Sequence, residues 1–424
     1  MALTLSGTNG VVGAGFTLDP SGASVTAGVG TFSSAKVGAA VTITESGIEA
    51  SGIGITCANI NGGSIGGRRN LIINGAMMVA QRGTSSSTNN VYGTVDRMKF
   101  RSGDNDEIAT RSQITLSSSD TGPYQKGFRK AYRIQNGNQT SGAGAGDWQQ
   151  FQYTVEAQDI ASSGWDYTNS NSFITLSFWI RSSVGQRFYG YLESFDGTGQ
   201  RYSFAIDGGS ALSANTWRFV SIKIPGNSNL QFDNDNGQGL DIKFVTFYGT
   251  NYTDNSYSMN NWAATATVNP NYMVDYDSTW YETNDATWDM TGIQLEVGPE
   301  ATSFEHRSFG EELELCKRYY QQSYPYALAY PGQTSYTNGN EVFHIDDGNI
   351  QRYMVRLHKT MRGASATVVI YNPNTGASDS VRTNDGSNHN PSGAYDIGNN
   401  SFFMDVTPSS GEFVSFHWTA DTEF

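Results

Sequence analysis

The chain has 424 residues, a formal net charge of −14 at pH 7, and 37% hydrophobic and 12% aromatic residues. The negative charge argues against nucleic-acid binding and against attraction to anionic lipid, because both need a basic face. Abundant Gly, Ser, Thr, Asn and Tyr together with few helix-forming residues predict an all-β protein with many turns, and the length predicts two or three domains. Neither a signal peptide nor a membrane-spanning window is recognisable, so we expect a soluble protein without membrane insertion.

Residues 1–67 differ in composition from the rest of the chain. They contain one lysine and no arginine, and small residues separate short β-type runs at Ser24–Val29, Val41–Thr44 and Ile53–Thr56. So few large side chains cannot bury a core alone, yet valine and isoleucine are too frequent for a disordered linker. We therefore predict a docking and oligomerisation segment, since small apolar strand edges pair readily with other chains. The alternative is a flexible leader.

Residues 68–307 contain a series of strand patterns with no long helical pattern between them. The expected strands are Phe173–Ile180, Arg187–Phe195, Arg201–Ile206, Trp217–Ile224, Leu240–Tyr248 and Thr291–Val297. Apolar and polar residues alternate in most of them, as in half-buried strands, and the turn-rich loop Asp196–Gly199 predicts a hairpin. Strands at this spacing predict a jelly-roll β-sandwich.

Residues 308–424 begin with a short helical pattern and continue as strands. Apolar residues at helical spacing predict a helix at Glu311–Tyr320, with Ser308 and Glu311 as a capping box. Its end places Tyr319 and Tyr320 at a domain boundary, where we expect contacts with neighbouring chains. The expected strands of this C-terminal β-sandwich domain are Met354–Leu357, Ala366–Tyr371, Ser401–Val406 and Phe413–Trp418.

Two motifs stand about one domain apart in the sequence. The first is RNLIINGAMMVAQRG at Arg69–Gly83, followed by Thr94–Arg97, and the second is TGIQLEVGPEATSFEHRSFGEELELCKRYY at Thr291–Tyr320. Together they resemble the jelly-roll module of tail-fibre and other virion structural proteins of tailed bacteriophages. The order of the strands between them also resembles carbohydrate-binding-module jelly rolls. The motif residues singled out are Asn74, Gly75, Gln81, Arg82, Asp96, Arg97, Gln294, Glu296, Glu305 and Arg307.

The charged residues of these motifs have a structural interpretation. Asp96 with Arg97, and Glu305 with Arg307, are expected to pair and to lock together the first and last strands, which are neighbours in a jelly roll. His306, which stands between the last two, is expected to bond to neighbouring backbone.

The resemblance implies a virion structural protein that is not an enzyme, most similar to a tail-fibre or appendage subunit that adheres to host surface glycan. It implies that residues 1–67 bind other virion proteins, and the threefold symmetry common among fibres implies a homotrimer. The expected location is the virion, with no cofactor. Alternatives are a head-decoration or neck appendage protein without receptor binding, and a glycan-cleaving enzyme.

Few residues of this chain suggest catalysis. None of the five histidines lies in a recognisable nucleophile motif, and the sequence has no GxSxG, HExxH or P-loop pattern. Cys57 and Cys316 lie in different expected domains, so we predict two free thiols, no disulfide and no cysteine-ligated metal.

Two acidic segments are candidate binding sites. In the first, carboxylates alternate with aromatic rings, and these two groups together can bind a sugar. Its candidate residues are Tyr276, Asp277, Trp280, Tyr281, Asp285 and Trp288. As a surface platform it would tolerate Trp280→Ala without loss of the fold. The alternative is a solvated loop whose rings pack onto the domain. In the second segment, Asp233 and Asp235 resemble part of a calcium loop, although the distant glutamate is missing.

Overall fold

The computed structural model describes residues 34–37, 41–44, 47–50, 68–326, 340–344, 350–384, 388–389, 393–406 and 413–424. The chain divides into two compact units, Met1–Ala58 and Asn59–Phe424. In the first unit, β1 (Ser34–Val37), β2 (Val41–Thr44) and β3 (Gly47–Ala50) form an antiparallel sheet. β2 coincides with one of the predicted strands. The other two predicted strands of this segment, and Cys57, lie outside the described residues.

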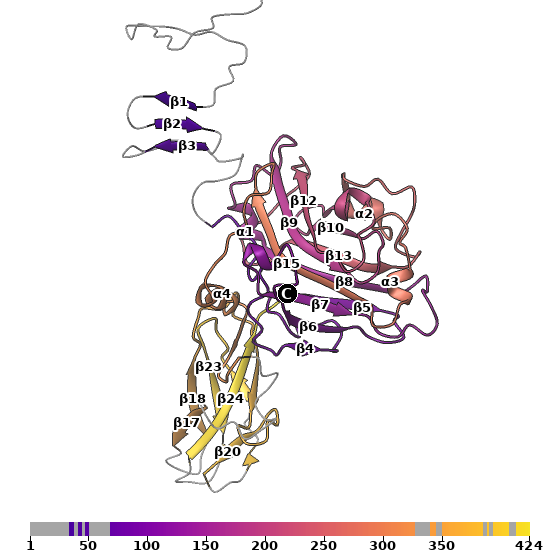
Figure 1. Ribbon diagram of the computed structural model, residues 1–424. Helices are drawn as coiled ribbons and strands as arrows, with labels where there is room; N and C mark the ends of the chain where they lie inside the picture. Colours follow the sequence, from indigo (N-terminus) through magenta and orange to yellow (C-terminus); the bar gives the residue numbers. More distant parts are fainter. Residues whose placement is uncertain are drawn as a thin grey trace, which may run out of the picture. The chain divides into compact units, whose positions relative to one another are not determined.

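Residues 68–307 form a β-sandwich of two six-stranded antiparallel sheets (Figure 1). The first, which we call the β13 sheet, has the order β14 (Trp262–Ala264), β11 (Gln200–Ala205), β10 (Tyr189–Ser194), β13 (Gln238–Tyr248), β8 (Trp148–Glu156) and β5 (Lys99–Gly103). The second, which we call the β9 sheet, has the order β12 (Arg218–Pro225), β9 (Phe173–Ser182), β15 (Thr287–Val297), β7 (Lys130–Gln135), β6 (Thr110–Thr115) and β4 (Ser85–Ser86). This is the all-β fold class that the sequence predicts.

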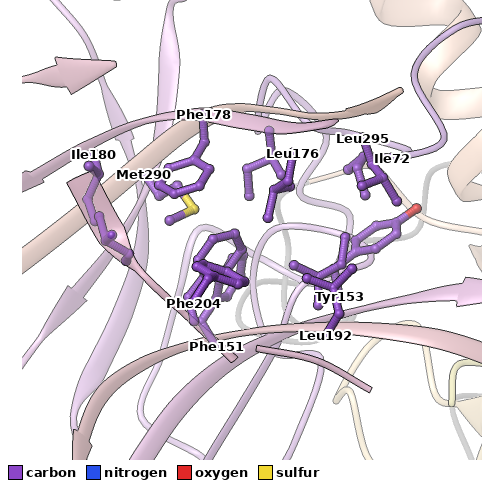
Figure 2. Close-up of a cluster of buried hydrophobic side chains, with 14 of the residues drawn as sticks. Ile72, Phe151, Tyr153, Leu176, Phe178, Ile180, Leu192, Phe204, Met290 and Leu295 are labelled. Carbon is purple, nitrogen blue, oxygen red and sulfur yellow. The ribbon is translucent and has the colours of Figure 1, made fainter. Parts of the chain in front are cut away.

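Apolar side chains from the facing sides of the two sheets form one core (Figure 2). Leu176, Phe178 and Ile180 of β9 point toward Phe151 and Phe204 of the β13 sheet, and all five are 0% exposed. Burying side chains of this size stabilises the fold by about 1.5–3 kcal/mol each. The alternation predicted for β9 is therefore confirmed, and it turns the intervening residues of that strand outward.

Every strand predicted in this region is present. Five of the six agree with the prediction to within two residues at each end, whereas β15 begins four residues earlier, at Thr287. The predicted hairpin is also present, because β10 pairs with β11 in antiparallel register. Short helical segments lie in the connections: η1 (Tyr124–Lys126), α1 (Ala157–Ala161), η2 (Ile206–Gly209), α2 (Thr265–Val268) and α3 (Thr279–Glu282).

Residues 308–424 begin with helix α4 (Phe309–Cys316), where Ser308 and Glu311 form the predicted capping box. The helix is shorter than predicted because Tyr320 already belongs to a strand. The strands are β16 (Tyr320–Gln322), β17 (Glu341–His344), β18 (Gln351–Arg356), β19 (Thr367–Tyr371), β20 (Val381–Thr383), β21 (Asn388–His389), β22 (Gly393–Tyr395), β23 (Ser401–Val406) and β24 (Phe413–Asp421).

The long strand β24 organises these C-terminal strands. It pairs with β16, β17, β19 and β20, while β18, β23 and β22 form a separate sheet. Side chains of both sheets form one shared core, separate from that of the sandwich, which includes Phe402, Met404, Phe416 and Trp418. In the part of the chain that the structure describes, no helix is long and apolar enough to cross a membrane.

Candidate functional site

The first motif forms a tight loop that packs on β15. Asn74 has a left-handed backbone (φ 62°), and its side chain donates to the carbonyls of Val79 (2.9 Å) and Asp96 (3.0 Å). A Cβ on Gly75 would lie 2.1 Å from the carbonyl oxygen of Ile293, so only glycine fits there. The Asn-Gly pair of the motif is therefore structural.

The second motif ties the chain just before this loop to the end of the sandwich. Arg307 pairs with Glu305 at 3.3 Å, as predicted, and donates to the carbonyl of Asn70 at 2.6 Å. Glu305 in turn accepts from the backbone N–H of Asn70 at 2.6 Å. Gln294 of β15 accepts from the Glu305 N–H and donates to Glu296, both at 2.8 Å. Asn70 lies outside any strand, so these bonds join a connecting segment, and not a first strand, to β15.

Asp96 and Arg97 do not pair with each other, contrary to expectation. The buried Arg97 pairs with Glu423, and Asp96 accepts from the Gln81 N–H at 2.9 Å and lies 3.9 Å from Arg82. We call these five residues the arginine network. Burial raises the pKa of Asp96 and of Glu423 above their ordinary values, against the attraction of the two arginines. The network joins the sandwich to the last residues of the C-terminal strands.

Tyr319 and Tyr320 pack on the arginine network and are not available to a neighbouring chain. The guanidinium of Arg97 lies 3.4 Å from the ring centroid of Tyr319, and that of Arg82 lies 3.7 Å from the ring centroid of Tyr320. A desolvated contact of this kind contributes about 2 kcal/mol. The rings are only 1% and 5% exposed, so the expectation of contacts between chains is wrong for these residues.

Cys316 lies on α4 beside this network and is a free, buried thiol. Burial raises its pKa well above the ordinary value, and the thiol is a far weaker nucleophile than the thiolate. In a Cys57→Ser variant we expect a thiol reagent to react with the native protein at least tenfold more slowly than with the denatured protein. Titration with and without denaturant measures this ratio. Equal rates would show that Cys316 is accessible.

Three of the four aromatic residues of the acidic loop are core residues, and the predicted sugar platform is wrong for them. Trp280, Tyr281 and Trp288 are each 0% exposed. Trp280 donates from Nε1 to the carbonyl of Thr287 at 3.1 Å, and Tyr281 stacks on Phe247 at 4.3 Å between ring centroids. A ring face covered by other side chains cannot stack on a sugar. The alternative interpretation, rings packed onto the domain, is the one that the structure shows.

The remaining members of that loop are bound to neighbouring residues of the chain. The hydroxyl of Tyr276 donates to the carbonyl of Val245 at 2.5 Å. Asp277 pairs with Arg187 at 3.2 Å, and Asp285 accepts from Gln135 at 2.7 Å. Neither carboxylate lines the cleft of about 310 Å³ at this loop, which Tyr276 lines together with Asp275 and Glu282. The predicted set of residues is therefore not brought together in one site.

The calcium candidate is likewise engaged in local turns. Asp235 accepts from the N–H of Gly237 at 2.8 Å, and Asp233 accepts from Gln231 at 3.3 Å. Over the described ranges of the chain, no group of three or more His, Cys, Asp or Glu side chains could hold a metal ion.

A groove of about 560 Å³ on the outer face of the β9 sheet is the best candidate site, and we call it the aromatic groove. Trp179 of β9 and Phe219 of β12 are register partners whose ring centroids lie 5.4 Å apart, and Phe219 is 43% exposed. On the other side, the rings of Phe128, Phe304 and His306 lie within 4.8–5.0 Å of one another. Five rings from distant parts of the sequence therefore line one groove.

The second motif shapes this groove. Gly292 sits in an irregular stretch of β15 with φ 66°, and a Cβ there would lie 2.6 Å from the ring of Phe128. Glycine thus lets that ring rest on the strand. A ring nitrogen of His306 lies 2.9 Å from the carbonyl oxygen of Lys126, which is the backbone bond predicted for this histidine.

The groove combines apolar walls with polar lining residues. Its rings supply the walls, and the polar residues Ser177, Ser303 and Lys126 are also part of its lining. Sequence reasoning missed this site. The available signal was the alternation of β9, which places Trp179 on the outer face.

Comparison with known proteins gives weak matches. No family model and no curated protein sequence matches the chain. It is similar to the enzymatically active domain of tailspike protein 4 from bacteriophage CBA120, with 10% identity and a TM-score of 0.28 over 54% of this chain and 21% of that chain. It is also similar to a family 11 carbohydrate-binding module from Clostridium thermocellum (14% identity, TM-score 0.23, 52% of this chain, 98% of that chain). A third match is the CBM22-1 xylan-binding domain of Paenibacillus barcinonensis Xyn10C, with 9% identity and a TM-score of 0.25 over 56% of this chain and 100% of that chain. Likenesses this low carry no argument about what this chain binds.

Proposed function

We propose that the chain is a virion structural protein without enzymatic activity, a tail-fibre or appendage subunit of a tailed bacteriophage that adheres to host surface glycan. The aromatic groove is the observation that carries the adhesive role. The resemblance of the two motifs supports the virion role, because it extends over separate stretches in the right order.

The chemistry of the groove suits a sugar better than a flat protein surface. A sugar ring has an apolar C–H face that packs on aromatic rings and hydroxyls that bond at the edge of a groove. A volume of about 560 Å³ lies within the usual range for small-ligand pockets. The residues that line it include no aspartate or glutamate, whereas glycoside hydrolysis commonly uses a pair of them. This favours adhesion over cleavage.

Removing the two facing rings of Trp179 and Phe219 tests the adhesive role. Each stacking contact is worth about 0.5–1.5 kcal/mol beyond area burial. The Trp179→Ala/Phe219→Ala variant should therefore bind host cells, or glycan extracted from them, at least about fivefold more weakly. Adsorption of the purified protein measures this loss, and thermal unfolding checks the fold.

Phe195→Ala is the matched control, because Phe195 is 42% exposed and lies outside the groove. It should adsorb as the unmodified protein does. If the double variant is folded and adsorbs equally well, the groove is not the adhesive site.

The second candidate is an architectural subunit that touches no receptor. The same exposed rings favour it, because aromatic residues are also enriched in contacts between protein chains. If the unmodified protein binds neither host cells nor their extracted glycan, this role is preferred. Release of reducing ends from that glycan would instead indicate a glycan-cleaving enzyme.

We also propose that the subunit is a homotrimer that docks on other virion proteins through residues 1–67. The short strands β1 to β3 leave edges that can pair with other chains. Light scattering of the full chain should give three times the monomer mass of 46.1 kDa. A variant without Met1–Gly67 should keep its folded domains but should not be incorporated into particles. A monomer at micromolar concentration would contradict the trimer, and normal incorporation would contradict docking.

A further inference from the structure

A second cleft, of about 330 Å³, lies within the Asn59–Phe424 unit. One wall is the segment from Arg82 to Gly93, and the other is the outer face of β16, β19 and β24. The register places Thr367 and Tyr320 on either side of Asp421 along that face. The cleft thus brings the first motif together with the C-terminal sheet.

Arg82 lies at the base of this cleft with part of its hydrogen-bonding capacity unused. Its side chain is 10% exposed, and Nη2 donates to the carboxylate of Asp421 at 2.9 Å. Nη1 has no hydrogen-bond partner among the described residues, since the carboxylates of Glu423 and Asp96 lie 3.6 Å and 3.9 Å away. The buried hydroxyl of Tyr92, another lining residue, is also without a partner in the described chain. Buried polar groups in this state are rare in native proteins.

The charges around Arg82 indicate a neutral ligand. Three carboxylates, those of Asp421, Glu423 and Asp96, lie within 3.9 Å of this one guanidinium. Their negative charge disfavours an anionic ligand, and Arg82 and Arg97 already supply the cations beside these carboxylates. A neutral molecule with several hydroxyls meets no such repulsion.

The groups of the cleft suit a ligand of that kind. Arg82 lines the cleft as a cationic donor with a side chain that is 10% exposed, the carboxylate of Asp421 is 36% exposed and can accept, and Thr419 adds a hydroxyl on the sheet. The ring of Tyr371 offers an apolar surface nearby. Pockets of this volume at the meeting of two folded bodies commonly bind small molecules.

We propose that this cleft binds one neutral saccharide unit through Arg82 and Asp421. The site shares no residue with the aromatic groove and does not depend on it. A chain with both sites would hold a host glycan at two places, which increases overall affinity without any new contact at either place.

The test uses the full chain carrying Trp179→Ala and Phe219→Ala, so that the groove does not contribute. The probes are free glucose, galactose, mannose and N-acetylglucosamine at millimolar concentration, with binding followed by saturation-transfer NMR or calorimetry. We expect at least one of these sugars to bind at one site per chain. If none of the four binds, the proposal is wrong.

Thr367→Trp, added to that variant, then places a large ring in the cleft from an exposed position. It should weaken binding of the sugar at least tenfold, and Asp421→Asn should weaken it as well. Thr375→Trp is the matched control, because Thr375 is an exposed residue of the same domain outside the cleft, and it should have no effect. Binding that survives both Thr367→Trp and Asp421→Asn would overturn the proposal. A separate measurement tests whether the aromatic groove is the adhesive site. If it is not, the groove variant with an intact cleft adsorbs to host cells as the unmodified protein does.

Discussion

Replacing Arg97 by methionine should lower the free energy of unfolding by about 3–5 kcal/mol, because the variant leaves the buried carboxylate of Glu423 without its closest cation. The substitution also removes the donor to the carbonyl of Thr154 and the contact with the ring of Tyr319. Chemical denaturation followed by fluorescence measures the loss. The C-terminal strands should lose one of their ties to the sandwich, while the ion pair of Arg318 with Glu156 remains. Unfolding of these strands should therefore begin at a lower denaturant concentration than unfolding of the sandwich.

Two further variants show whether the loss comes from the arginine network. Arg97→Met with Glu423→Gln removes both charges and should recover part of the stability. Arg352→Met is the matched control, because Arg352 also pairs with a carboxylate, that of Asp405, but is 52% exposed. It should change stability little, since exposed ion pairs contribute little. If Arg97→Met is no more destabilising than this control, the network does not hold the two bodies together.

Trp280→Ala should destabilise the sandwich by about 3–5 kcal/mol, the cost of removing a large buried ring and leaving a cavity. This is the opposite of what a surface sugar platform would show. Thermal unfolding measures the effect, and Phe195→Ala, which removes an exposed ring, should cost far less. A variant that kept full stability and lost glycan binding would restore the platform interpretation.

The strands could be predicted where apolar and polar residues alternate. β9 is the clearest case, because its inward residues are all large and apolar. β8 was missed, although Phe151, Tyr153 and Val155 alternate in it. The polar glutamines near these residues predict an exposed segment, yet Gln150 and Gln152 are only 3% and 4% exposed. Whether the outer face of a strand is buried depends on contacts with residues distant in the sequence, and the periodicity of the strand itself does not predict those contacts.

The candidate sites were harder to predict for the same reason. Acids alternating with rings look alike whether the rings face solvent or turn inward, and α3 turns Trp280 and Tyr281 inward. The structural role of the motif residues and the pair of Glu305 with Arg307 could be predicted. The partner of Arg97 could not, because it lies 326 positions away in the sequence. The aromatic groove needs β9, β12 and the second motif together, so only the folded chain brings its rings into one place.

The distance along the chain between Arg97 and Glu423 has a consequence for synthesis on the ribosome. Chains grow at about 5–20 residues per second, so on the order of tens of seconds pass between the emergence of the two partners. During that interval the sandwich can collapse around its own core, but Arg82 and Arg97 lack the carboxylates of Asp421 and Glu423, and Asp96 is the one carboxylate of the network already present. A nascent or prematurely released chain therefore carries a patch with two arginines and one carboxylate, whose excess positive charge the finished protein neutralises with Asp421 and Glu423. Quality-control factors that recognise such a patch could distinguish incomplete chains from complete ones before assembly.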